Sequence, residues 1–248
     1  MLRRLDLRGV TADLRAVLPR PVSAGEEPVA AVQAILADVR ERGDVALREL
    51  TERFDRLDDP LGDLRVSQTE LDEALDAIPP LLREALEAAK ANILAYHREQ
   101  LHDPVVYERD GVTVRELRRS VDRAGLYVPG GRARYPSTVL MTAIPARVAG
   151  VPELVLCCPP DTNGSLPAAT LAAAALAGVD EVYRVGGAQA IAAMAYGTES
   201  IGAVDVIVGP GNVYVSIAKR EVASQGVVGV PSSFPGSSEV VVVADASS

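Results

Sequence analysis

Three times between residues 125 and 212, a short apolar stretch runs directly into a glycine-rich turn. The three segments are GLYVPGG at 125–131, VYRVGG at 182–187 and VIVGPGN at 206–212. In an open parallel sheet, ligands bind outside the carboxyl ends of the strands, where such turns lie. Glycine lets the backbone turn sharply and approach a ligand, and a helix after the turn offers free N–H groups to a phosphate. The pattern therefore predicts a sheet edge that binds a nucleotide.

Composition excludes several classes of partner. The 248 residues are 48% hydrophobic, which is enough to fill a core, and they carry a net charge of −9. Nucleic acids and anionic membranes favour a basic surface, so neither is expected as a partner. The N-terminal sequence has no apolar signal region, and no apolar run is long enough to cross a bilayer. Cys157 and Cys158 are adjacent, so a disulfide between them could not join distant segments. They indicate a cytoplasmic protein in which both thiols are free and bind no metal.

The first half of the chain is charged and its pattern is helical. Ser23 and Glu26 have the spacing of a capping box, and the helix that follows is expected to end at Gly43. Ser67 with Glu70 predicts the start of another helix. Residues 105–117 alternate around Asp110-Gly111, which predicts a hairpin.

The second half alternates between strand and helix patterns. Strands are expected at 154–157, 181–185, 204–208 and 239–244, and helices at 139–149, 167–176, 188–195 and 213–222. Ser137 is expected to cap the first of these helices, and Pro145 to kink or shorten it. The alternation predicts an α/β fold of incomplete Rossmann-like parallel sheets with helices on both faces, preceded by a helical N-terminal region.

Common nucleotide and metal motifs are not matched. Residues 209–214 begin like G-x-G-x-x-G, but Tyr214 stands where the third glycine belongs, and the chain has no P-loop sequence. His97 and His102 lie about 140° apart on one predicted helix, so they do not form a metal-binding pair. Gln189 and Asn212 are amides at helix starts beside glycine turns, where they favour recognition of ribose or nicotinamide groups. The alternative is that these turns only connect strands to helices.

Eight segments together resemble the histidinol dehydrogenase family. They are LDLRG at 5–9, AYHREQ at 95–100, GLYVPGG at 125–131, YPSTVLM at 135–141, VYRVGGAQAI at 182–191, AYGTE at 195–199, IVGPGN at 207–212 and AKR at 218–220. The resemblance covers essentially the whole chain. It implies a division into an N-terminal extension (1–22), the helical first part of a Rossmann-like domain with the hairpin (23–120), a second Rossmann-like domain (121–235) and a strand returning to the first domain (236–248).

The resemblance also implies a function. The family oxidises L-histidinol to L-histidine through the aldehyde, with two hydride transfers to NAD, and it uses zinc and forms a homodimer. In the matching motifs, the NAD contacts fall on Tyr127, Gln189 and Asn212. A serine that contacts the substrate falls on Ser238, although Ser237 stands where the family has proline.

The family's zinc ligands and its glutamate–histidine acid/base pair do not occur within residues 1–248. The chain is therefore expected to be either a fragment of a longer enzyme or a degenerate relative, and to have no catalytic zinc and no histidinol turnover by itself. Two alternatives stay open: a non-catalytic NAD-binding module, and a dehydrogenase of another polar alcohol.

Overall fold

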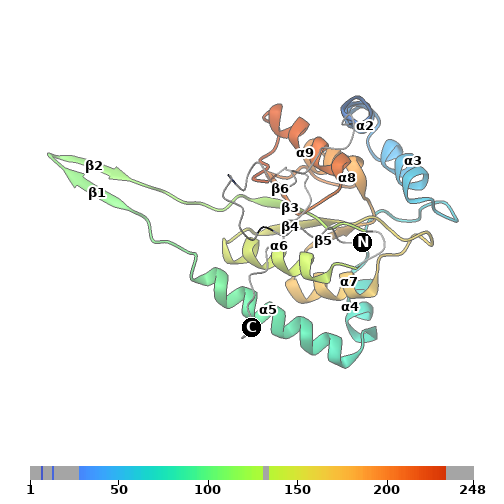
Figure 1. The fold of residues 1–248 in the computed structure, drawn as a ribbon, viewed down its shortest axis with the longest axis horizontal. Helices are drawn as coiled ribbons and strands as arrows, with labels where there is room; N and C mark the ends of the chain where they lie inside the picture. Colours follow the sequence, from blue (N-terminus) through green and yellow to red (C-terminus); the bar gives the residue numbers. More distant parts are fainter. Residues whose placement is uncertain (1–6, 8–12, 14–27, 131–133, 233–248) are drawn as a thin grey trace.

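The computed structural model describes residues 7, 13, 28–130 and 134–232. Within them, a four-stranded parallel sheet has the strand order β5-β4-β3-β6 (Figure 1). The strands are β3 (Arg123–Tyr127), β4 (Glu153–Cys157), β5 (Glu181–Tyr183) and β6 (Val206–Val208). In the register, Tyr127 pairs with Cys157, Cys157 with Tyr183, and Leu126 with Val208. The carboxyl ends of all four strands therefore meet at one edge.

Helices cover both faces of this sheet, which confirms the predicted α/β class (Figure 1). One face carries α4 (Gln68–Ala77), α5 (Pro80–Arg98), α6 (Pro136–Val148) and α7 (Ala168–Ala177). The other carries α2 (Val29–Arg42), α3 (Asp44–Asp55), α8 (Gly187–Tyr196) and α9 (Val213–Ser224). Helices from the first half of the chain thus pack on both faces of the sheet formed by the second half. The division of the chain at residues 22, 120 and 235 stays a prediction.

The alternation of side chains along each strand explains why both faces are apolar. Leu126 and Leu156 lie in the core beneath α6 and α7, whereas their neighbours Tyr127, Val155 and Cys157 lie in the core beneath α8. Successive strand residues point to opposite faces, so a strand covered on both sides needs a continuous apolar run. After their charged first residues, β3 and β4 have such runs at 124–127 and 154–157.

The order of the strands reverses between β3 and β6. From β3 the chain passes through α6 to β4 and through α7 to β5, moving outwards on one side. Helix α8 then carries the chain back across to β6, on the other side of β3. In open α/β sheets, ligands bind at such a reversal point, in the crevice beyond the strand ends.

Local signals in the first half behave as expected where the structure describes them. Ser67 caps α4, because its hydroxyl accepts a hydrogen bond from Glu70 N while the Glu70 carboxylate accepts one from Ser67 N. Gly43 ends α2 with a φ of 54°. The predicted capping box of Ser23 and Glu26 lies outside the described residues.

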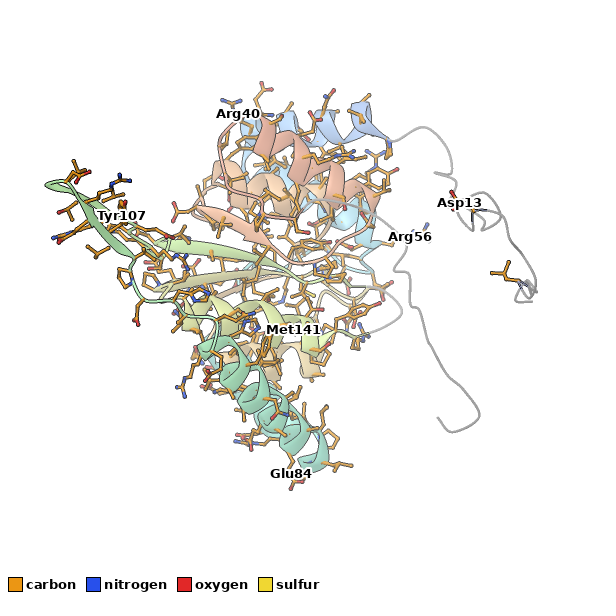
Figure 2. The ribbon with its side chains drawn as sticks, turned by 60° about the vertical axis from the view of Figure 1, so that its left-hand side comes forward. Asp13, Arg40, Arg56, Glu84, Tyr107 and Met141 are labelled. Atoms are coloured by element: carbon orange, nitrogen blue, oxygen red, sulfur yellow. The ribbon has the colours of Figure 1, made fainter. Side chains whose placement is uncertain are left out.

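The predicted hairpin is confirmed, and it extends far from the body of the molecule (Figure 1). It consists of β1 (Val106–Arg109) and β2 (Val112–Arg115), and both turn residues, Asp110 and Gly111, have positive φ. All residues of the two strands are exposed. Figure 2 shows Tyr107 of this hairpin on the opposite side of the molecule from Arg56, the residue that follows α3. The hairpin therefore leads into the amino end of β3, away from the strand ends that carry the glycine turns.

Some sequence expectations were wrong in detail. Ser137 does not cap α6, because the helix begins at Pro136, and proline suits a first position where no N–H partner is needed. Pro145 lies inside α6 and does not end it, because the helix continues to Val148; the expected kink stays a prediction. His102 lies beyond the end of α5, so it does not share a helix with His97. The expected strand at 239–244 lies outside the described residues.

Candidate functional site

A pocket of about 660 Å³ opens at the carboxyl edge of the sheet. All four strand ends contribute to it, and α2 and α3 close one side. Its lining residues are Ile35, Phe54, Asp55, Tyr127, Pro129, Gly130, Pro159, Pro160, Asp161, Thr162, Gly187, Ala188, Gln189, Asn212 and Tyr214. The volume falls within the range of small-molecule and cofactor sites. The structure therefore brings Tyr127, Gln189 and Asn212 together in one pocket.

Tyr127 is the last residue of β3 and is buried. Its hydroxyl oxygen accepts a hydrogen bond from the backbone N–H of Gly187, at 3.1 Å. Burial raises the pKa of the phenol, so the side chain stays neutral at physiological pH. With its oxygen already accepting from Gly187, the O–H group remains free to donate to a ligand.

The third glycine turn packs directly against the end of β3. Gly209 has a φ of 107°, and a Cβ at this position would lie 2.0 Å from the carbonyl oxygen of Tyr127. Only glycine fits such an approach. Lys219 of α9, which is buried, donates a hydrogen bond from Nζ to the carbonyl oxygen of Gly209. Burial lowers the pKa of this lysine to about 8. The turn is thus fixed by its packing against Tyr127 and by the hydrogen bond from Lys219.

Gln189 is the feature that most clearly indicates a ligand. It lies in the first turn of α8 and is only 1% exposed, yet neither Oε1 nor Nε2 has a hydrogen-bond partner among the described residues. Leaving a buried polar group unsatisfied costs about 1–3 kcal/mol, so native structures rarely do so without a reason. A ligand in the pocket would supply the missing partners.

Asn212 supplies a second amide, from the start of α9. Its Oδ1 accepts a hydrogen bond from Val215 N at 3.1 Å, which caps the helix. The Nδ2 group is then the part that can donate to a ligand. The N-termini of α8 and α9 both border the pocket, and helix N-termini attract phosphate groups.

The pocket contains two carboxylates in different environments. Asp161 forms an ion pair with Arg134, with 2.6 Å between Oδ1 and Nη1. Asp55, at the end of α3, has an Oδ2 atom that is inaccessible to solvent and lacks a hydrogen-bond partner in the described parts of the chain. Burial raises the pKa of Asp55 to about 6. Asp55 was not predicted from the sequence, because it lies in an amphipathic helix far from the glycine turns and belongs to no motif.

Zinc does not fit the described residues. Across 28–130 and 134–232, no group of three or more His, Cys, Asp or Glu side chains could hold a metal ion. Cys157 and Cys158 are buried, and burial raises the pKa of Cys158 to about 12, which disfavours the metal-binding thiolate. His97 lies on α5, where its Nδ1 is 2.6 Å from Gln100 Oε1. Ser238, the expected substrate contact, lies outside the described residues.

The fold and the pocket define a class: α/β proteins with a doubly wound parallel sheet and a small-molecule pocket at its carboxyl edge. The family model for histidinol dehydrogenase matches residues 18–248. The chain belongs to the histidinol dehydrogenase family. None of the helices in the described part of the chain has the length and apolarity that a membrane crossing requires.

Individual relatives agree with this assignment. Histidinol dehydrogenase from Bordetella parapertussis is 48% identical over 99% of this chain and 56% of its own length. The protein of the same name from Methanothermobacter thermautotrophicus is 51% identical over 86% of this chain and 49% of its own length. The crystal structure of histidinol dehydrogenase from Elizabethkingia anophelis superposes with a TM-score of 0.84 at 36% identity, covering 90% of this chain and 51% of that one. The chain thus spans about half the length of these relatives.

Proposed function

We propose that this chain carries the NAD-binding part of a histidinol dehydrogenase, an oxidoreductase of histidine biosynthesis. The reaction converts L-histidinol, two NAD⁺ and water to L-histidine, two NADH and protons. The observation that carries the proposal is the buried Gln189 amide without partners, in a pocket between glycine turns, in a chain of this family.

The pocket residues fit NAD. Tyr127 and Asn212 each keep a donor for the cofactor, and Gln189 offers both a donor and an acceptor. The N-termini of α8 and α9 suit a pyrophosphate, although the third glycine of the dinucleotide fingerprint is replaced by Tyr214. When bound, NAD supplies the hydride acceptor for both oxidations.

The chain's own contribution is to bind and orient the cofactor. Pro129, Pro159 and Pro160 form rigid, apolar parts of the wall. Tyr127 connects the end of β3 to the start of α8, so the first two glycine turns keep a fixed separation. Positioning of this kind lowers the entropic cost of reaction. The described residues form no zinc site, and we assign no step to zinc here.

For the complete protein we propose a homodimer in the cytoplasm that acts on a small-molecule substrate. The family resemblance supports the dimer, and the composition supports a partner other than nucleic acid or membrane. Light scattering of the protein from its complete gene is expected to give twice the mass of one chain. A mass of one chain that persists at high concentration would refute the dimer.

The test of the activity is NADH formation by the protein produced from its complete gene. L-Histidinol is expected to yield two NADH per molecule, and L-leucinol, which lacks the imidazole ring, to yield little. Absence of NADH from a folded protein that binds NAD would support a non-catalytic relative. Equal rates with both alcohols would support a dehydrogenase of another substrate class.

A further inference from the structure

The C-terminal turn of α3 forms a wall of the pocket that is independent of the sheet. Phe54 and Asp55, its last two residues, both line the pocket. They come from the first half of the chain, whereas the glycine turns come from the second. The pocket is therefore bounded by two helix N-termini on one side and by a helix C-terminus on the other.

These helix ends carry opposite partial charges. The N-termini of α8 and α9 favour an anion, and the C-terminus of α3 disfavours one. A dinucleotide has charged phosphates in the middle and uncharged nucleosides at its ends. The phosphates therefore suit the α8 and α9 side, and a nucleoside suits the α3 side.

The two α3 residues match a nucleoside in chemistry. Phe54 is 46% exposed although it is a large apolar side chain, so its ring is available to stack on a base. Asp55 lines the pocket and is half-buried, and its Oδ2 has no hydrogen-bond partner among the described residues. A carboxylate accepts hydrogen bonds from ribose hydroxyls, as an acidic residue does in many dinucleotide-binding folds.

We infer that Asp55 binds a ribose hydroxyl of the cofactor and thereby selects NAD over its 2′-phosphorylated form, NADP. This inference rests on the proposed NAD site. A 2′-phosphate would replace the donated hydroxyl with a charge of the same sign as the carboxylate. Asp161, the other carboxylate of the pocket, is already balanced by Arg134, so the discrimination is assigned to Asp55.

Calorimetric titration with NAD and NADP tests this inference. The wild-type chain is expected to bind NAD at least about tenfold more tightly than NADP, because a hydrogen bond to a charged group is worth about 1.5–3 kcal/mol. The Asp55→Asn variant keeps the side-chain shape, removes the charge and is expected to reduce this preference about tenfold or more. Asp59→Asn, which removes the same charge from an exposed position outside the pocket lining, is the matched control and is expected to retain the wild-type preference.

A third ligand separates hydrogen bonding from general repulsion. NAD that lacks the adenosine 2′-hydroxyl is expected to bind the wild-type chain about tenfold more weakly than NAD, and to bind Asp55→Asn with a much smaller difference. An NAD/NADP preference unchanged in Asp55→Asn, with NAD still bound, would overturn the role of Asp55 alone. Failure of the wild-type chain to bind NAD would overturn both the proposed cofactor site and this inference.

Discussion

The hydroxyl oxygen of Tyr127 lies 3.1 Å from the backbone nitrogen of Gly187 and accepts its hydrogen bond. This contact joins the end of β3 to the start of α8, two segments that are 60 residues apart in sequence. The carbonyl oxygen of the same tyrosine is also the group against which Gly209 packs. One residue thus fixes the positions of the second and third glycine turns, so its substitution should affect both stability and binding.

Tyr127→Phe is expected to lower the free energy of unfolding by about 0.5–1.5 kcal/mol and to weaken NAD binding about two- to tenfold. The reason is the loss of one acceptor for Gly187 N–H and of one donor for the ligand. Urea unfolding and calorimetry measure the two effects. Tyr107→Phe on the exposed hairpin is the control, and equal effects from both variants would argue against the role of Tyr127.

Gly209→Ala is expected to destabilise the protein by more than about 3 kcal/mol, because it combines a positive φ with a steric overlap against Tyr127. Gly226→Ala is the matched control. Its φ is 68°, and an added Cβ would meet nothing within 4 Å, so only the left-handed backbone cost of about 1–2 kcal/mol applies. Thermal or urea unfolding of both variants gives the comparison. Similar losses would mean that the close approach to Tyr127 is unimportant.

Asp55 should make stability depend on pH. Burial raises the pKa of this carboxyl from 3.8 to about 6 in the folded state, so between these values the folded protein holds a proton that the unfolded chain has released. The contribution of Asp55 to stability is therefore lost as pH rises through about 6. The free energy of unfolding of Asp55→Asn should equal that of the wild type near pH 4 and exceed it at pH 7. Urea unfolding at each pH measures the difference. A difference that does not change with pH would show that Asp55 has an ordinary pKa.

Much of the fold was predictable because its signals are local. The three glycine turns and the strand–helix alternation identified a parallel sheet, and the capping box of Ser67 and Glu70 located α4. The position of Gln189 and Asn212 in the pocket was predictable because amides at helix starts beside such turns face the carboxyl edge of the sheet. Tyr127 came from family resemblance, and its contact with Gly187 required the three-dimensional structure.

The remaining features depend on contacts between distant segments. No local pattern in α3 shows that Asp55 reaches the pocket, since this requires α3 to pack beside α8. The start of α6 was misplaced because Ser137 and Pro136 compete as start signals, and the proline takes the first helical position. The end of α5 at Arg98, before His102, was likewise not marked by glycine or proline.

The most direct test of the cofactor site is the NAD affinity of Gln189→Met, measured by calorimetry beside the wild type and an exposed control, Gln68→Met on α4. Methionine has nearly the same length and shape as glutamine but no amide, so the unliganded variant is expected to be as stable as the wild type or more so, since it buries no unsatisfied amide. NAD is expected to bind Gln189→Met about tenfold more weakly than the wild type and to bind the control as tightly as the wild type. An NAD dissociation constant that is the same in all three proteins would show that Gln189 does not bind the cofactor.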